Sequence, residues 1–281
     1  MVKVIKPGIY STIQDLGRFG FQKYGVPISG VMDSYSSKLA NTLLGNNDND
    51  AVLEITIKGP TLEFHTNTTI CITGADLSPN LNSVPIKNNK PILIAEGDNL
   101  SFGSLNSGVR SYLAVLGGFQ THLVMKSRSM YKHITNSFLI NKNDVLPIAK
   151  SNQKVEFNSI AVDDNHIKAN IIGVFKGPEF DKLSESEKKR FFSQKFSVSE
   201  NNNRMAYQLN EPLENNLEPI ITSMVLPGTV QLTPSGKLIV LMRDCQTTGG
   251  YPRVLQLSEQ AINGLSQKFT NDEIKFELIN N

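Results

Sequence analysis

Short apolar runs separated by turn-forming residues follow one another along most of this 281-residue chain. Runs of this length, bounded by Gly, Pro, Asn and Asp, are typical of β-strands. The clearest run lies near the C-terminus, where Ile274, Phe276 and Leu278 alternate with Lys275 and Glu277 and so predict a half-buried strand. The pattern predicts further strands at residues 51–57, 70–73, 92–95, 110–116, 170–175, 229–233 and 238–242.

Three segments instead show helical spacing. The first covers residues 33–44, where Asp33 is suited to the N-cap, Leu39 and Leu43 share one face, and Gly45 fits the C-terminal stop. The second covers residues 184–194 and begins with a capping-box pattern. The third begins after Ser258 and ends before Asn271. Its predicted buried face consists of Ala261, Ile262, Leu265 and Phe269.

A polar stretch at residues 150–168 separates two β-rich halves. We therefore predict an N-terminal subdomain of residues 1–165 and a C-terminal subdomain of residues 166–281, together mainly β with a few short helices. Hydrophobic residues make up 39% of the chain, enough for a sizeable core. The net charge is +2 and no basic face stands out, so nucleic acid is not an expected partner.

The cysteine and histidine content narrows the classes of site. Only Cys71 and Cys245 are present, far apart in sequence, so a disulfide framework is not expected and a reducing cytoplasm is the default location. The four histidines are isolated, without metal-binding spacing, so no metal site is predicted. No run reaches the length of a membrane span or of a signal-peptide core, so neither is expected.

One loop carries most of the candidate chemistry. The apolar run 238–242 opens into residues 244–252, with the sequence DCQTTGGYP. Gln246, Thr247 and Thr248 offer hydrogen-bond donors and acceptors, and the paired glycines permit close backbone approach. The segment is therefore either a cradle for a small polar ligand or a glycine turn between two strands. For Cys245, a buried structural role is favoured over a nucleophilic one.

Further motifs occur in a fixed order along the chain. They are TIQDLGR at 12–18, GVPISGVMD at 25–33, ANTLLGN at 40–46, LE at 53–54, GP at 59–60, TGA at 73–75, RSYLAV at 110–115 and GG at 117–118. Together they resemble the allophanate hydrolase subunit 2 family, also called the biotin-dependent carboxyltransferase A/B domain family. The resemblance runs from about Ile5 to Phe276, nearly the whole chain.

This resemblance implies two β-barrel subdomains of cyclophilin-like topology. It also implies a role as the C subunit of an ATP-dependent 5-oxoprolinase, which converts 5-oxo-L-proline to L-glutamate. The implied partners are a protein like the B subunit of that enzyme, together with its A subunit. ATP is implied as a co-substrate of the complex, with no covalently bound cofactor. Two alternatives stay open. One is half of a biotin-dependent carboxyltransferase of the urea type, and the other is a non-catalytic antagonist of a histidine-kinase inhibitor.

Several polar residues match polar positions of the family motifs. By this resemblance the expected catalytic residues are Asp33, Glu54 and Gln246. The expected substrate-binding residues are Arg18, Arg204, Gln231, Thr247, Thr248 and Tyr251. Each has a structural alternative. Asp33 caps a helix, Glu54 pairs with a base inside the barrel, Arg18 pairs with Asp15, Arg204 braces a loop, and the polar groups after residue 242 satisfy a turn.

The chain departs from the family pattern in one region. The family motif LGSRST corresponds to residues 125–130, where Lys126 replaces Gly and Met130 replaces Thr. Residues 130–146 contain no glycine, and Asn143 stands where the family has the Gly of a closing GD pair. Because turns with positive φ favour glycine, either this loop is remodelled or its function is lost. No biotin is expected on Lys126.

Overall fold

The computed structural model describes residues 1–149 and 162–279. The chain divides into two compact units. Unit 1 comprises Met1–Arg18 and Ser29–Ile167, and unit 2 comprises Phe19–Ile28 and Lys168–Asn281. The subdomain boundary inferred from the sequence, between residues 165 and 166, stays a prediction. Residues 150–161 of the predicted linker lie outside the described residues.

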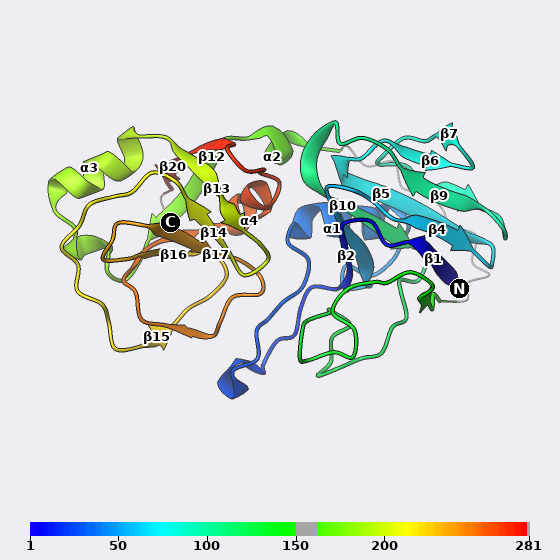
Figure 1. Ribbon diagram of the computed structural model, residues 1–281, viewed down its shortest axis with the longest axis horizontal. Helices are drawn as coiled ribbons and strands as arrows, with labels where there is room; N and C mark the ends of the chain where they lie inside the picture. Colours follow the sequence, from blue (N-terminus) through cyan, green and yellow to red (C-terminus); the bar gives the residue numbers. More distant parts are fainter. Residues whose placement is uncertain (150–161, 280–281) are drawn as a thin grey trace. The chain divides into compact units, whose positions relative to one another are not determined.

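Unit 1 contains two β-sheets (Figure 1). The six-stranded sheet has the order β11-β1-β4-β9-β6-β7, and the five-stranded sheet has the order β2-β3-β10-β5-β8. The first sheet is formed by β1 (Val2–Lys6), β4 (Thr61–Phe64), β6 (Pro79–Leu81), β7 (Val84–Pro85), β9 (Asn99–Phe102) and β11 (Val145–Leu146). The second is formed by β2 (Tyr10–Gln14), β3 (Val52–Thr56), β5 (Thr68–Asp76), β8 (Ile92–Ile94) and β10 (Ser107–Val115).

The five-stranded sheet is buried on both faces, which explains its long apolar runs. On one face Ile72 and Leu113 join a core cluster with residues of the six-stranded sheet. On the other face Cys71 and Ala114 pack against helix α1 (Ser34–Leu43). Neighbouring residues of β5 and β10 therefore contribute to different layers, as the two-residue period of a strand requires.

Unit 2 contains a closed seven-stranded barrel with the order β12-β19-β16-β17-β14-β13-β20. Its strands are β12 (Ile171–Lys176), β13 (Phe196–Asn202), β14 (Ala206–Leu209), β16 (Thr229–Leu232), β17 (Leu238–Leu241), β19 (Arg253–Leu257) and β20 (Glu273–Leu278). β12 and β20 pair in parallel, and the other barrel neighbours pair antiparallel. A separate ribbon joins β15 (Ser223–Met224) to β18 (Thr248–Gly249).

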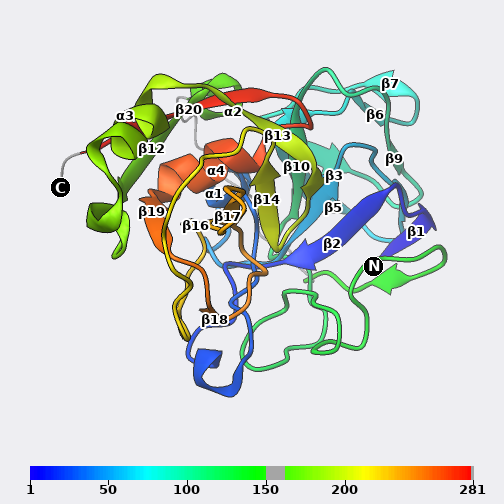
Figure 2. The same cartoon turned by 60° about the vertical axis from the view of Figure 1, so that its left-hand side comes forward.

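Short helices accompany the barrel. Helix α4 (Glu259–Ser266) packs on β12 and β19 (Figure 2). Phe191 of helix α3 (Glu185–Ser193) lies with Phe196 and Phe276 in an aromatic core cluster, with ring centroids 5.4–6.4 Å apart. The remaining short helices are η1 (Gln22–Tyr24), α2 (Asn165–Lys168) and η2 (Phe180–Lys182).

The mainly β architecture and all three predicted helices are confirmed. Asp33 caps α1, and Ser184 and Glu187 form the capping box of α3. Two burial predictions are wrong. Phe269 is 46% exposed because α4 ends three residues earlier, and Leu278 is 38% exposed at the last position of β20.

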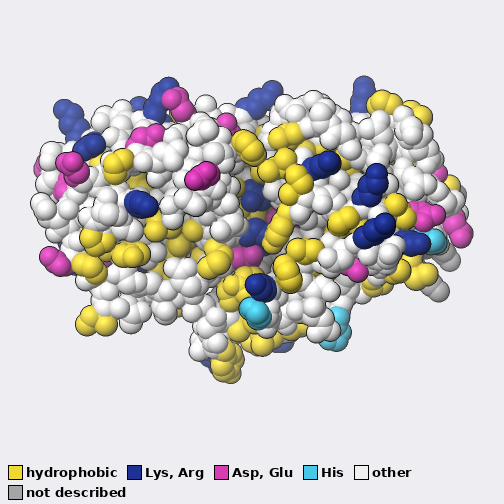
Figure 3. All heavy atoms as spheres, in the orientation of Figure 1, with side chains coloured by type: hydrophobic (Ala, Val, Ile, Leu, Met, Phe, Trp, Pro, Cys, Tyr) yellow, Lys and Arg dark blue, Asp and Glu magenta, His cyan; other side chains and the backbone are white. Residues whose placement is uncertain are grey.

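Charges of both signs are present on the face of the molecule in Figure 3. Lys and Arg side chains occur there as well as Asp and Glu side chains, with apolar side chains between them. Within residues 1–149 and 162–279, none of the helices combines the length and hydropathy that a bilayer-crossing helix requires.

Candidate functional site

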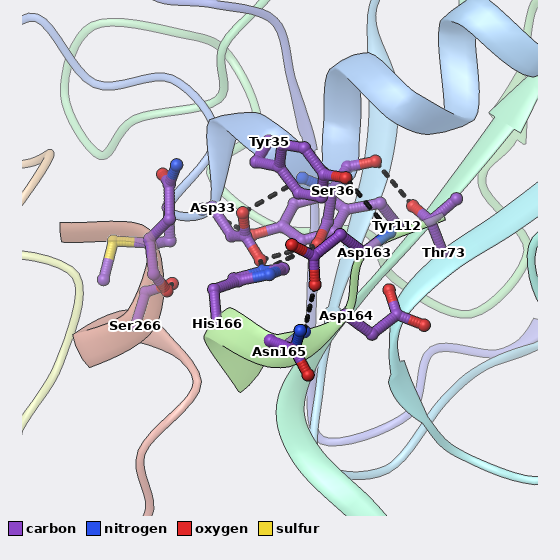
Figure 4. Close-up of polar contacts among 12 residues, drawn as sticks. Asp33, Tyr35, Ser36, Thr73, Tyr112, Asp163, Asp164, Asn165, His166 and Ser266 are labelled. Carbon is purple, nitrogen blue, oxygen red and sulfur yellow. Dashed lines mark hydrogen bonds and ion pairs between the residues drawn. The ribbon is translucent and has the colours of Figure 1, made fainter. Parts of the chain in front are cut away.

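Asp33 lies at the centre of a buried polar cluster in unit 1 (Figure 4). Its Oδ1 accepts a hydrogen bond from the backbone N–H of Ser36 at 3.0 Å, and its Oδ2 accepts one from the Ser36 hydroxyl at 2.6 Å. Nε2 of His166, on α2, lies 2.8 Å from the same Oδ2. The carboxylate therefore caps α1 and also anchors α2.

This grouping of Ser, His and Asp does not form a proton relay. Ser36 Oγ lies 3.4 Å from Nε2 of His166, the same nitrogen that contacts Asp33. A nucleophilic triad needs the acid and the hydroxyl on different ring nitrogens. The geometry is that of a buried ion pair supported by a hydroxyl.

The pair shifts both protonation equilibria. Burial alone would raise the pKa of Asp33, but the hydrogen bond and charge of His166, with the Ser36 donors, outweigh it and hold that pKa below its usual value. Burial alone would lower the pKa of His166, but the hydrogen bond and charge of Asp33, aided by the charge of Asp164, raise it. Each shift favours the charged form of its group, so together they favour the charged pair.

Glu54 is linked to Asp33 through Tyr112. The Tyr112 hydroxyl donates to Oε2 of Glu54 at 3.0 Å and accepts from the backbone N–H of Asp33 at 2.8 Å. The backbone N–H of Met32 also donates to Oε2 of Glu54, at 2.7 Å, and Nε of Arg110 lies 3.9 Å from Oε1. Burial, together with the charge of Glu54, raises the pKa of Tyr112 well above its usual value. Glu54 is thus held inside the unit and has the basic neighbour that the structural alternative required.

Arg18 is almost completely buried in unit 1. Its Nε donates to the carbonyl of Val124 at 3.1 Å, and its Nη2 donates to the carbonyl of Ser129 at 2.8 Å. Asp15 binds the same loop, because its Oδ1 accepts from the hydroxyls of Ser127 and Ser129. Arg18 and Asp15 therefore both hold the same loop.

Arg204 and Asp244 form a bidentate ion pair in unit 2. Nε and Nη2 of Arg204 lie 2.8 and 3.0 Å from the two carboxylate oxygens, and both residues are buried. The backbone N–H of Asp244 also donates to the carbonyl of Arg204 at 2.8 Å. This pairing holds the start of the 244–252 loop against the turn before β14.

Cys245 follows directly and is buried. Burial, together with the charge of Asp244, raises the pKa of its thiol to about 12. At neutral pH such a thiol is protonated and a weak nucleophile, so the geometry agrees with a structural cysteine.

Gln231, on β16, is buried against the glycine pair of the loop. A Cβ at Gly249 would lie 2.4 Å from Nε2 of Gln231, so any larger residue would displace this amide. The same Nε2 donates to the carbonyl of Tyr251 at 3.4 Å. Glycine at this position therefore lets the loop lie directly on Gln231.

The other polar residues of the loop point outward to different degrees. Gln246, Thr248 and Tyr251 are exposed, and Thr247 is half-buried. Their backbone is fixed, because the carbonyl of Thr247 accepts from the N–H of Val225 at 3.2 Å and β18 pairs with β15. A fixed backbone with exposed amide and hydroxyl groups is a suitable surface for a polar ligand.

Within unit 1 the structure thus brings Asp33 and Glu54 into one network. Within unit 2 it places Gln231, on β16, against the loop that carries the exposed residues. Arg18 and Arg204 each serve a hydrogen-bonded network of their own unit. The catalytic and substrate-binding roles of all these residues stay predictions.

A family model described as "Carboxyltransferase domain, subdomain A and B" matches residues 24–278. The chain belongs to this carboxyltransferase-domain family. The resemblance inferred from the ordered motifs is confirmed.

Named relatives of this family cover the chain to different extents. The chain is 33% identical over 274 residues to the C subunit of 5-oxoprolinase from Escherichia coli, covering 95% of this chain and 87% of that protein. It is 36% identical over 231 residues to urea amidolyase of Lachancea kluyveri, covering 75% of this chain but only 12% of that protein. The chain therefore matches most of one relative and a small part of the other.

A solved structure supports the same membership. The crystal structure of the Kluyveromyces lactis urea amidolyase superposes with a TM-score of 0.89 and 29% identity, covering 99% of this chain and 19% of that one. Both units of this chain therefore have counterparts within a much longer protein.

The residues that replace glycine in the carboxyltransferase-domain family pattern have left-handed backbone conformations. Met125 and Lys126 adopt φ values of 51° and 64° between the bridged residues Val124 and Ser127. Two consecutive residues with positive φ form the type of turn that favours glycine. Asn143, at the other replaced glycine, adopts φ 72°. The loop thus has residues other than glycine at these left-handed positions.

Sequence reasoning missed several members of these networks. His166 was judged only for metal binding, although Asp163 and Asp164 before it signalled a polar segment. Glu179 and Arg253 form a second bidentate pair, at 3.0 and 2.9 Å, which no motif indicated. Among the described residues, no group of three or more His, Cys, Asp or Glu side chains is arranged to hold a metal ion. The expectations about cofactors stay predictions.

Proposed function

We propose that this chain is the C subunit of an ATP-dependent 5-oxoprolinase. In this reaction one water opens the lactam of 5-oxo-L-proline to give L-glutamate, and a second water is consumed as ATP becomes ADP and phosphate. A lactam is a stable amide, so its carbonyl must be activated before water attacks. ATP is the co-substrate that supplies the driving force, and no cofactor is bound covalently to the chain.

The observation that carries this proposal is the collinear match to the C subunit of 5-oxoprolinase. The match covers 95% of this chain and 87% of the Escherichia coli protein, so the two are similar in extent as well as in sequence. A protein named as one subunit of an enzyme works with others. We therefore expect two partners, one like the B subunit of 5-oxoprolinase and the other its A subunit.

The proposed roles follow the chemistry of each group. Carboxylates are suited to general-base work, which we assign to Asp33 and Glu54. The exposed amide of Gln246 is suited to donate a hydrogen bond to the lactam carbonyl as negative charge develops on it. The substrate-binding set consists of Arg18, Arg204, Gln231, Thr247, Thr248 and Tyr251.

The arginines in this set are proposed for the substrate's α-carboxylate, because a guanidinium fork binds carboxylates well. Arg204 already binds Asp244, so a substrate carboxylate would have to share or replace that contact. A neutral lactam without the carboxylate separates the two roles. If Arg204 binds the substrate, Arg204→Lys will weaken the binding of 5-oxoproline far more than the binding of the neutral lactam.

The test of the function is an omit-one reconstitution. The chain is combined with the A and B subunits from the same organism, and L-glutamate release from 5-oxoproline is measured with ATP. We expect glutamate only from the full set and none from this chain alone. Glutamate formation by the A and B subunits at the same rate without this chain would overturn the proposal.

A second candidate is half of a carboxyltransferase that moves a carboxyl group from carboxybiotin to urea. The 36% identity to urea amidolyase favours it, although the match spans 12% of that protein. Urea is neutral, whereas 5-oxoproline is an anion. Urea-dependent loss of the carboxyl group from a carboxybiotin carrier, in the presence of this chain, would favour this candidate over the first.

A further inference from the structure

A cavity of about 260 Å³ lies in unit 1 beside the glycine-free loop. Its wall combines apolar side chains, among them Val124 and Met130, with the polar side chains of Arg128, Ser137 and Asp144. Mixed walls of this kind, apolar with a few polar groups, are typical of small-molecule sites. The volume is close to the lower end of ligand pockets, so the occupant must be small.

Arg128 is held in place by the network around Asp15. Its backbone N–H donates to Oδ2 of Asp15 at 2.6 Å, and the flanking serines bind Oδ1 of the same carboxylate. The Arg128 guanidinium donates to the carbonyl of Thr121 and, at 2.6 Å, to Oε1 of Gln120. A side chain fixed at both its backbone and its tip is preorganised for binding.

The guanidinium of Arg128 differs from those of other arginines in the groups that it contacts. Four others contact a carboxylate, namely Arg110, Arg204, Arg243 and Arg253. Arg128 bonds to neutral oxygens instead, and no acidic side chain of the part of the chain that the structure describes forms an ion pair with it. A cation in a cavity wall without an acidic partner favours an anionic ligand.

The rest of the wall limits which anion fits. Asp144 lines the same cavity and accepts from the backbone N–H of Asn141 at 2.7 Å. The carboxylate of Asp144 beside the Arg128 guanidinium disfavours a doubly charged phosphate and favours a single carboxylate that also carries an N–H donor, and the imidazole of His122 lines the same wall. Thr121 adds a hydroxyl oxygen that has no hydrogen-bond partner among the described residues.

We propose that this cavity binds a small monocarboxylate with an N–H group. The Arg128 fork holds the carboxylate, Asp144 accepts from the N–H, and the apolar wall covers the carbon skeleton. Lactam acids such as 5-oxoproline and amino acids such as glutamate share this chemistry. The inference rests on the cavity itself and does not require that the chain takes part in 5-oxoproline hydrolysis.

The experiment is calorimetric titration of the whole chain with 5-oxo-L-proline, L-glutamate and the neutral lactam 2-pyrrolidinone. We expect at least one of the two carboxylates to bind, and 2-pyrrolidinone to bind much more weakly. Arg128→Gln should lower the affinity for the carboxylate by about tenfold or more, as expected for the loss of a charged hydrogen bond. Arg128→Lys keeps the charge but loses the guanidinium fork, so its affinity should lie between those of the wild type and Arg128→Gln.

Two further variants make the result decisive. Lys132→Gln removes an exposed charge of the same loop that does not line the cavity, and it should leave binding unchanged. Ser137→Phe keeps Arg128 but narrows the cavity at an exposed position. It should therefore also weaken the binding of the carboxylate. The proposal is overturned if neither carboxylate binds at millimolar concentration, or if Arg128→Gln and Ser137→Phe, both still folded, bind as the wild type does. Because no turnover is measured, this outcome is independent of the reconstitution result.

Discussion

The phenolic oxygen of Tyr112 lies 3.0 Å from Oε2 of Glu54 and donates a hydrogen bond to it, while accepting one from the backbone N–H of Asp33. One side chain of β10 therefore joins the carboxylate of Glu54 to the backbone of Asp33, the two residues that we propose for catalysis. All three residues are buried, so these hydrogen bonds lie in the low-dielectric interior of the unit, where they are stronger than in water.

Tyr112→Phe should destabilise unit 1 because it leaves Glu54 and the Asp33 N–H each without one partner. A buried group that loses its partner typically costs about 1–3 kcal/mol. The measurement is the free energy of unfolding in urea. Tyr24→Phe, at an exposed tyrosine, is the matched control and should change nothing. Equal stability of the two variants would mean that the bridge contributes no net free energy.

The buried pair of Asp33 and His166 should make stability depend on pH. The raised pKa of His166 contributes stability below its unfolded value of about 6.5 and loses it as pH rises through the folded pKa. The lowered pKa of Asp33 contributes stability above its unfolded value of about 3.9 and loses it as pH falls through the folded pKa. The pair is therefore most effective between these two unfolded values.

His166→Gln should cost about 1.5–3 kcal/mol at pH 5.5, and less at pH 9, because the contribution of the ion pair is lost as pH rises through the folded pKa. The readout is urea unfolding at both pH values. His133→Asn is a suitable control because His133 is exposed and adopts φ 68°, a conformation that Asn tolerates. A deficit for His166→Gln that is as large at pH 9 as at pH 5.5 would show that the ion pair is not its source.

Arg204 and Asp244 should behave as a coupled pair. Arg204→Met leaves a buried carboxylate without its cation and should cost roughly 3–5 kcal/mol. Adding Asp244→Leu removes that charge, so the double variant should recover part of the loss. A double-mutant cycle on the unfolding free energy measures this recovery. Purely additive losses would contradict a direct interaction.

Variants at Gln246 and Gln231 should distinguish a role in ligand binding from a role in the stability of the loop. Gln246 is exposed, so Gln246→Ala should leave the melting temperature unchanged while lowering the activity of the reconstituted complex. Gln231 is buried below Gly249, so Gln231→Ala should lower the melting temperature as well. If Gln246→Ala kept full activity, the exposed part of the loop would have only a structural role.

Much of the fold was predictable because local signals and burial agree. The cap at Asp33 and the capping box at Ser184 depend on residues within one helical turn, so the sequence alone indicates them. Phe269 shows where this reasoning ends. Its spacing continues the helical face of α4, but the chain leaves the helix at Gln267 and the side chain is exposed.

The site was less predictable because its contacts are long-range. Glu54 and Tyr112 are 58 residues apart, and Asp33 and His166 are 133 residues apart. A motif reports which side chains a segment offers, whereas the pairing of β3 with β10 decides which of them meet. Arg128 lies two residues after Lys126, which the motif comparison singled out. The sequence does not show that its guanidinium contacts neutral oxygens.

If this chain is the C subunit of a 5-oxoprolinase, the ATP-driven conversion of 5-oxoproline requires it. The most direct measurement is the ratio of ADP to L-glutamate formed by the A and B subunits with and without this chain, with either 5-oxoproline or urea as the substrate. We expect one ADP per glutamate with 5-oxoproline, only when this chain is present, and no ADP above background with urea. Unchanged glutamate formation without the chain, or ADP formation that depends on urea and not on 5-oxoproline, would contradict it.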